Sequence, residues 1–185
     1  MSRPRITVLL FAVVCTAQLA APLSMIWRHE RTLRTGTAFK VQTEPVDPVD
    51  AFRGRYVAVS PFVEIVEPPA EPLYGEVWVE LETGPDGFAR ARRATAKRPD
   101  GPTAIRGTMS PPREQSGGPA RVLLGLDRYY MEESKAPAVE HEYAGRARRG
   151  AGRAWLVIRV RDGMAAIEAL YLDGNRAEDV LARPQ

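Results

Sequence analysis

The sequence predicts an α+β protein in which an N-terminal transmembrane helix precedes a mainly antiparallel β domain with one substantial helix. Residues 6–27 carry no charged side chain. Most of the remaining chain consists of short runs of alternating apolar and polar residues separated by Gly and Pro, which is typical of strands joined by tight turns. Residues 137–149 have the composition of a helix, with Pro137 in its first turn.

The apolar segment is 22 residues long. As a helix it reaches about 33 Å, enough to cross a hydrocarbon layer of roughly 30 Å. The alternative is a cleaved secretory signal with residues 15–17 as the small-residue cleavage site. That cut leaves an apolar core of only residues 6–14, although the apolar run continues to Ile26. The length of the run therefore favours an uncleaved anchor.

Two charge patterns around the apolar segment favour opposite orientations in the membrane. Arg3 and Arg5 precede it, and further basic residues follow it closely, namely Arg28, Arg31, Arg34 and Lys40. A count of Lys and Arg alone favours an N-terminus outside the cytoplasm. A short basic start before one apolar run is nevertheless the signal-anchor pattern. We therefore expect a single-pass protein of the cytoplasmic membrane whose C-terminal domain is extracytoplasmic, in the periplasm.

The expected organisation is a cytoplasmic tail, a transmembrane signal-anchor, a helical stalk, one β-rich domain and a C-terminal tail, over residues 1–5, 6–27, 28–36, 37–177 and 178–185. In the stalk, Glu30 and Arg34 have the spacing of a helical ion pair. Beyond residue 27 the chain has 24 basic and 23 acidic residues, with the two signs interspersed. This balance argues against nucleic acid as a partner.

Alternation predicts the individual strands. It is clearest in residues 76–82, where Val77, Val79 and Leu81 share one side. Residues 84–87 and 161–163 have the composition of hairpin turns. Residues 97–119 hold five prolines and are expected to form a mobile loop around one short strand. The expected strands are 38–41, 55–65 with an interruption at Pro61, 76–82, 88–96, 105–109, 121–131, 154–160 and 165–172.

Residues 45–59 have an unusual pattern of prolines, aspartates and glycine. Asp47 and Asp50 are suited to accept backbone N–H bonds in turns, and Pro48 stiffens the bend between them. Gly54 permits a positive φ before the strand, and Tyr56 is interpreted as a ring that plugs the sheet while its hydroxyl finds a buried partner. The functional alternative is a surface pocket formed by Asp47, Asp50, Arg53 and Arg128.

This segment resembles the motif that names the GDYXXLXY family, and the resemblance covers most of the chain. Gly54 and Tyr56 match, whereas Arg55, Val59 and Pro61 stand where the motif has Asp, Leu and the second Tyr. Therefore no functional role that depends on that Asp or on the second Tyr is assigned to this chain. The residues carrying the first motif are Asp47, Pro48, Asp50, Arg53, Gly54, Arg55, Tyr56 and Val59, and those carrying a second motif are Arg128, Tyr129, Tyr130 and Glu133.

The resemblance implies a membrane-anchored bacterial protein of unknown function, and it suggests a multi-pass membrane protein as a partner besides the lipid bilayer. The residues themselves predict no cofactor and no metal. Acidic residues and one histidine gather at Glu132, Glu133 and residues 140–142. Because residues 140–142 are consecutive, their side chains diverge on a helix, unlike an i, i+4 ligand pair.

From these observations we expect an accessory or interaction domain without catalysis and without catalytic residues. Two alternatives stay open. One is an enzyme that uses the carboxylates of Asp47, Asp50 and Glu133, which requires them to share one water in a cleft. The other is a domain that binds a small ligand, which requires a concave apolar pocket.

Overall fold

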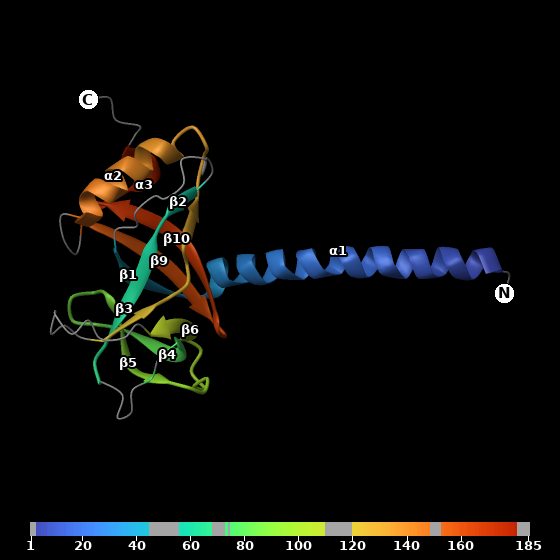
Figure 1. Ribbon diagram of the computed structural model, residues 1–185, viewed down its shortest axis with the longest axis horizontal. Coiled ribbons are helices and arrows are strands. Elements are labelled where there is room, and N and C mark those ends of the chain that lie inside the picture. The colour runs from blue at the N-terminus through green and yellow to red at the C-terminus, as the bar shows by residue number, and fades with distance from the viewer. Residues whose placement is uncertain are drawn as a thin grey trace.

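A long N-terminal helix, α1 (Arg3–Thr35), leads into a strand-rich domain in the computed structural model of the chain (Figure 1). The structure describes residues 3–44, 56–67, 73, 75–109, 120–148 and 153–180. This arrangement confirms the predicted fold class. The domain elements are β1 (Thr37–Glu44), β2 (Tyr56–Ala58), β3 (Ser60–Ile65), β4 (Gly75–Thr83), β5 (Ala89–Thr95), β6 (Ala104–Met109), β7 (Arg121–Leu123), β8 (Arg128–Tyr130), α2 (Ala136–Arg148), β9 (Ala154–Arg161), β10 (Met164–Leu172), β11 (Asn175–Arg176) and α3 (Ala177–Val180).

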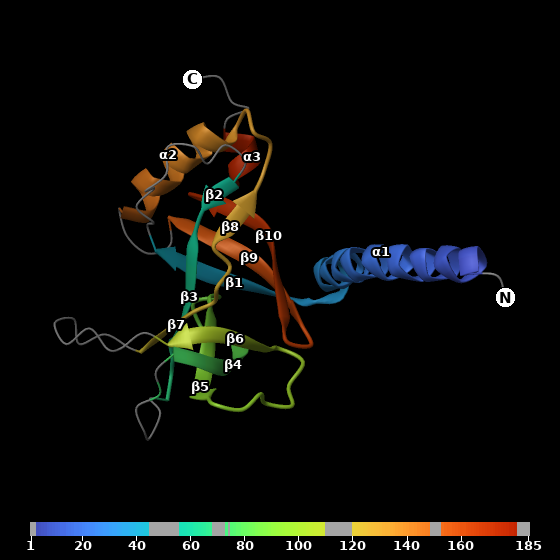
Figure 2. The same ribbon diagram turned by 45° about the vertical axis from the view of Figure 1, so that its right-hand side comes forward.

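Helix α1 projects from the side of the domain over most of its length (Figures 1 and 2). The stretch Ile6–Thr35 is long and apolar enough to span a membrane, and none of its most apolar window is buried against the protein. The expected stalk is the last part of this same helix. Its predicted ion pair is present, with Arg34 Nε donating to Glu30 Oε1 at 2.7 Å.

The strands form one nine-stranded sheet and a separate two-stranded ribbon. The large sheet has the order β11-β10-β9-β1-β3-β5-β4-β6-β7, and β3 also pairs with β7. Strands β3, β5, β4, β6 and β7 therefore close into a ring, while β1, β9, β10 and β11 continue the sheet beyond β3. All pairings between these strands are antiparallel except the short parallel one between β3 and β5.

Both predicted hairpins are confirmed. The β9–β10 turn places Asp162 at φ 50° and Gly163 at φ 86°, the pair of positive values that a type I′ turn requires. The β4–β5 turn is closed by the Gly84 N–H, which donates to the Phe88 carbonyl at 2.8 Å. In β4, Val77, Val79 and Leu81 are buried, as their alternation predicts.

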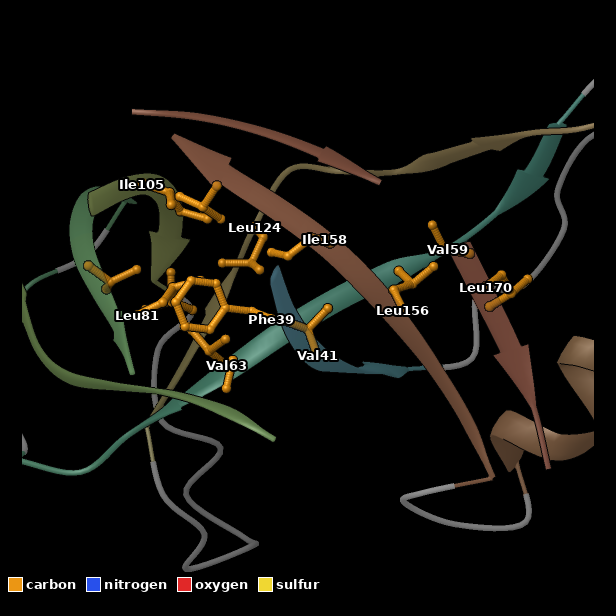
Figure 3. Packing of buried hydrophobic residues seen from close by; sticks show 14 of the residues in the cluster. Phe39, Val41, Val59, Val63, Leu81, Ile105, Leu124, Leu156, Ile158 and Leu170 are labelled. Atoms are coloured by element: carbon orange, nitrogen blue, oxygen red, sulfur yellow. The ribbon is translucent and has the colours of Figure 1, made fainter. Parts of the chain in front are cut away.

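One apolar cluster fills both the ring and the continuing sheet. Figure 3 shows Phe39 of β1 among ring residues that include Val63 and Leu81, with Val41 leading toward Leu156. The alternating burial of β9 places Leu156 and Ile158 in this cluster and Trp155 on the opposite face. Strand β1 therefore joins the two parts of the sheet through its side chains as well as its backbone.

The strand expected over residues 55–65 is interrupted at Val59 and not at Pro61. Pro61 lies inside β3 opposite Thr43. Proline has no N–H to donate, but its carbonyl accepts the Leu124 N–H at 3.0 Å. Because Pro61 takes part through its acceptor alone, the strand continues past it.

The single strand expected over residues 121–131 is two strands in different sheets, β7 and β8. Gly125 between them has φ 66°, a left-handed conformation that redirects the chain. The Asp127 carbonyl then accepts the Val59 N–H at 3.1 Å. The predicted run of residues was too long because its apolar pattern continues through this change of direction.

The short strand expected within residues 97–119 is confirmed as β6. It is an integral part of the ring, since Gly107 lies so close to β7 that an added Cβ would be 2.3 Å from a Val122 side-chain carbon. The observed strand, Ala104–Met109, begins one residue before the expected one. Residues 110–119 lie outside the described residues.

Helix α2 is attached to the sheet through the hydroxyl of Tyr143, whose side chain is 1% exposed. This hydroxyl donates to the Glu44 carbonyl at 2.7 Å and lies 2.7 Å from Thr43 Oγ1, which in turn accepts the Ser60 N–H. Burial raises the pKa of Tyr143 to about 12. The network thus provides hydrogen-bond partners for backbone groups at the end of β1 and at the start of β3.

The passage from α1 to β1 takes a single residue, Gly36. Its N–H donates to the Thr32 carbonyl at 2.8 Å, and its carbonyl accepts Arg159 Nη1 at 3.1 Å. Arg159 also donates from Nε to Glu168 Oε2 at 2.6 Å, and Arg161 donates to the Thr35 hydroxyl. The end of α1 is thus bonded to the β9–β10 hairpin.

The first prediction concerns Gly36→Ala. A Cβ at this position would lie 2.5 Å from the Thr32 carbonyl oxygen and 3.1 Å from that of Val160, both backbone atoms. We expect the free energy of unfolding to fall by about 1–3 kcal/mol, the usual cost of overpacking. Urea unfolding of the full chain in detergent measures it.

Gly145→Ala is the matched control, because a Cβ at Gly145 in α2 meets no atom within 4 Å. Alanine is favoured over glycine inside a helix by about 0.5–1 kcal/mol, so this variant should be no less stable than the parent. Equal stability of the Gly36 variant and the parent would contradict the tight junction.

Candidate functional site

The two motifs singled out in the sequence lie side by side, because β2 carries the end of the first and β8 carries the second. The strands pair antiparallel, with Tyr56 opposite Tyr130, Val57 opposite Tyr129 and Ala58 opposite Arg128. Residues 70 to 74 positions apart thus form one short ribbon, labelled β2 and β8 in Figure 2.

The outer face of this ribbon carries Tyr56, Arg128 and Tyr130, which we call the ribbon surface. The rings of Tyr56 and Tyr130 meet edge to face with centroids 5.9 Å apart. The Arg128 guanidinium lies 5.3 Å from the centroid of the Tyr56 ring. The Tyr130 hydroxyl and then Asp127 raise the pKa of Arg128, so it stays positively charged. Tyr130 is 67% exposed, which leaves this cluster open to a partner.

The inner face of the ribbon is anchored by Tyr129, which is 6% exposed. Its hydroxyl donates to Glu178 Oε1 of α3. Burial first, and then the hydrogen bond to Glu178, raise the pKa of Tyr129. Among the described residues, the buried Oε2 of Glu178 has no hydrogen-bond partner.

The interpretation of Tyr56 as the buried plug is therefore corrected. Tyr56 is half-buried on the outer face, and the ring that enters the interior with its hydroxyl bonded is Tyr129. Side chains alternate along a strand, so the pairing of Val57 with Tyr129 turns both inward and leaves Tyr56 outside. The sequence placed both tyrosines in strands without deciding which face of the ribbon would meet β10.

Only part of the first motif lies within the described residues. Val59 is buried between β2 and β3. Asp47, Pro48, Asp50, Arg53, Gly54 and Arg55 lie outside the described residues, so the turn-forming role and the pocket with Arg128 stay predictions. In the second motif, Glu133 is exposed in the segment between β8 and α2.

The acidic and histidine residues near α2 are distributed among separate contacts. Glu132 binds Ser134 and Lys135, with its carboxylate 2.9 Å from the Lys135 Nζ, and these bonds lower its pKa. Glu142 pairs with Arg146. Within the part of the chain that the structure describes, no three His, Cys, Asp or Glu side chains are grouped so as to hold a metal ion.

Sequence reasoning missed Glu178, which it had assigned to a C-terminal tail. Residues 177–180 are the helical turn α3, and Glu178 reaches the ribbon from there. Arg146 of α2 likewise bonds Asp173, at 2.6 Å from Nε to Oδ2. No local pattern marks either contact, because each joins segments that only the folded chain brings together.

A second aromatic cluster was also missed. Trp155 and Tyr171 stack with centroids 5.5 Å apart and parallel planes, and Lys40 Nζ lies 4.0 Å from the Trp155 centroid and 4.3 Å from that of Phe88. Trp155 and Tyr171 are direct cross-strand partners. Aromatic cross-strand pairs of this kind stabilise a sheet. The alternation of residues along β9 and β10 was the sequence signal that could have predicted this pair.

The prediction for this site is that Tyr129→Phe destabilises the fold. It removes the hydroxyl that donates to Glu178 Oε1, and a buried polar group that loses its partner costs about 1–3 kcal/mol. Chemical unfolding near neutral pH measures the loss. Tyr130→Phe, at an exposed position, should change stability by no more than about 0.5 kcal/mol.

The same variant has a pH signature. The pKa of Tyr129 is raised above its ordinary value of 10.0, so its stabilising effect is complete below pH 10 and is lost as the pH rises further. The free energy of unfolding of the parent should therefore fall above pH 10, and less steeply in Tyr129→Phe. Identical pH profiles would show that Tyr129 is not held in its neutral form.

Comparison with known proteins places these observations in a family. The description of the matching family model is GDYXXLXY protein, and the match covers residues 18–170, from the apolar helix through most of β10. No curated protein and no solved structure was found to be similar to the chain. The match spans both motifs and the hairpin that follows them, so the chain belongs to the GDYXXLXY family.

Proposed function

We propose that this protein is an accessory domain that α1 holds at the outer face of a bacterial cytoplasmic membrane, and that it binds a partner protein through the ribbon surface. The observation that carries the proposal is the meeting of the two motifs in an exposed cluster of Tyr56, Arg128 and Tyr130. The family to which the chain belongs has no established function.

The anchoring part of the proposal is supported by the exposure of α1. Its large apolar side chains from Ile6 to Trp27 are exposed. In water this arrangement loses the free energy of burying them, whereas hydrocarbon accommodates a helix that is apolar on all sides. Trp27 and the arginines after it suit the interface, where aromatic rings and snorkelling basic chains collect.

The binding part is supported by the chemistry of the ribbon surface. Tyrosine and arginine are among the residue types that most often dominate binding energy, because they combine apolar area with directional polar groups. Arg128 remains charged and is already held against the Tyr56 ring. Because Tyr129 fixes the ribbon to α3, a partner meets a surface that loses little entropy on binding.

A multi-pass membrane protein is the partner that we propose. It is suggested by the family resemblance, and co-location in one bilayer supports it because a shared membrane raises the effective concentration of two proteins. An enzymatic activity of this protein that uses the carboxylates of Asp47, Asp50 and Glu133 stays a prediction, since two of these residues lie outside the described residues. Binding of a small ligand likewise stays a prediction.

Fusion of topology reporters to the C-terminus tests the location. We expect a fused alkaline phosphatase, which folds only outside the cytoplasm, to be active and a fused reporter that is active only in the cytoplasm to be silent. Activity confined to the cytoplasmic reporter would overturn the extracytoplasmic assignment. Recovery of a soluble mature chain that has lost residues 1–17 would overturn the anchor.

A photo-crosslinking residue in place of Tyr130 tests the binding surface in intact cells. We expect one multi-pass membrane protein to be crosslinked, and Arg128→Ala in the same chain to reduce its yield by about tenfold or more, as expected for loss of an interface residue worth roughly 1.4 kcal/mol.

The same photo-crosslinker in place of His141, exposed on α2, is the matched control. The proposal fails if the partner is captured equally well from position 141, or if Arg128→Ala leaves its yield at position 130 unchanged.

A further inference from the structure

We propose that the domain rests on the membrane surface through a rim beside α1, formed by residues 97–103 between β5 and β6 and residues 161–164 at the β9–β10 turn, which adds to the positive charge of the helix exit. The partner of this rim is the head-group layer of an anionic bilayer. The inference rests on the proposed anchoring by α1. It concerns a different surface from the ribbon surface and would bring the domain flat against the bilayer.

The two segments of the rim are joined to each other. The Asp162 N–H donates to the Pro102 carbonyl at 3.1 Å, and Ile105 forms an isolated bridge with Gly163. The Arg98 guanidinium packs against Gly163, since a Cβ there would lie 3.3 Å from its central carbon. The same guanidinium lies over the Trp78 ring at 5.5 Å. The rim is therefore one continuous surface.

The register of β1 and β9 directs the rim toward the membrane. Thr37, the first residue of β1, pairs with Val160, and β9 then continues through Arg161 to the turn. Because β9 runs antiparallel to β1 and continues past the first residue of β1, Arg161 lies beside the segment that comes before β1. That segment is the end of α1. Both views show the β9–β10 turn on the α1 side of the domain (Figures 1 and 2).

The junction holds this direction fixed. Gly36 is the one residue between helix and strand, and its N–H and carbonyl are both bonded. Arg161 binds the Thr35 hydroxyl, and Arg159 spans from Gly36 to Glu168. Residues 28–35 add about 12 Å of helix beyond Trp27, and the head-group layer on each side is roughly 5–8 Å thick. The domain therefore begins a few ångströms from the head groups.

The rim lies on the α1 side of the domain, which faces this gap (Figures 1 and 2). Strand residues advance about 3.3 Å each, so Arg161 and Asp162 extend about 7 Å along β9 past the residue that pairs with the start of β1. At the tip, Met164 is 38% exposed although it is apolar. An exposed methionine flanked by arginines is suited to the boundary between head groups and water.

The charge of this side supports an anionic partner. The helix exit and the rim together hold six basic and three acidic residues: Arg28, Arg31, Arg34, Lys97, Arg98 and Arg161 against Glu30, Asp100 and Asp162. In the rest of residues 28–185, 20 acidic residues outnumber 18 basic ones. The excess of positive charge is thus concentrated at the membrane side. Each basic residue near an anionic surface strengthens attachment by about fivefold.

Spin labels on the full chain in vesicles of phosphatidylcholine and phosphatidylglycerol test this inference. The native Cys15 reports on the anchor, and in a Cys15→Ser background Met164→Cys reports on the rim. His141→Cys on α2, away from α1 in both views, is the control. We expect the label at 164 to be shielded from a water-soluble nickel chelate and the label at 141 to be accessible.

Removing one rim charge should weaken the shielding. Arg98→Gln should shift the ratio of shielded to accessible label at 164 by about fivefold, and vesicles of phosphatidylcholine alone should shift it further. Arg153→Gln is the matched control, because Arg153 precedes β9 at the end of the hairpin opposite the turn and is exposed. It should leave the ratio unchanged.

The outcomes separate this inference from the proposed anchoring. A label at Cys15 that is protected from the chelate, with labels at 164 and 141 equally accessible, overturns the rim while the anchor stands. A label at Cys15 that the chelate reaches overturns the anchor itself. Shielding at 164 that is equal with and without phosphatidylglycerol overturns the assignment of an anionic partner.

Discussion

The passage of the helix into the sheet through Gly36 is the constraint on which the rest of the structure depends. Two carbonyls and the Arg159 side chain approach this residue so closely that no Cβ fits. The single residue leaves no flexible linker, and both of its backbone polar groups are bonded. Whatever holds α1 therefore also sets the orientation of the β domain.

From this junction β1 enters the middle of the large sheet, with β9 on one side and β3 on the other. Its inward side chains, Phe39 and Val41, join the closed ring to the β9–β10 hairpin in one apolar cluster. An orientation fixed at Gly36 is thereby transmitted to the whole domain. The ribbon surface and the rim lie on different elements of the same domain, so the proposed contacts with a partner and with lipid would use different faces.

In the β2–β8 ribbon, neighbouring residues differ in whether they anchor the fold or face solvent. Tyr129 faces inward and its hydroxyl is bonded to Glu178, whereas Tyr130 is open to solvent. Substitution of the inner tyrosine is therefore expected to act on stability, and substitution of the outer one on the proposed binding. A sequence motif that contains both types of residue does not reveal which is which, because adjacent strand residues always point to opposite faces.

Sequence alone determined the apolar helix, the two hairpins and α2, since each depends on a local signal: an uninterrupted apolar run, a Gly-containing turn between alternating residues, and a proline at a helix start. Tertiary structure decided the closed ring, the separation of β7 from β8 at Gly125, the continuation of β3 through Pro61, and the meeting of Tyr56 with Tyr130. These features depend on hydrogen bonds and packing between residues far apart in the chain, which no local pattern encodes. Glu178 shows this most clearly, because its role depends on a tyrosine 49 positions away.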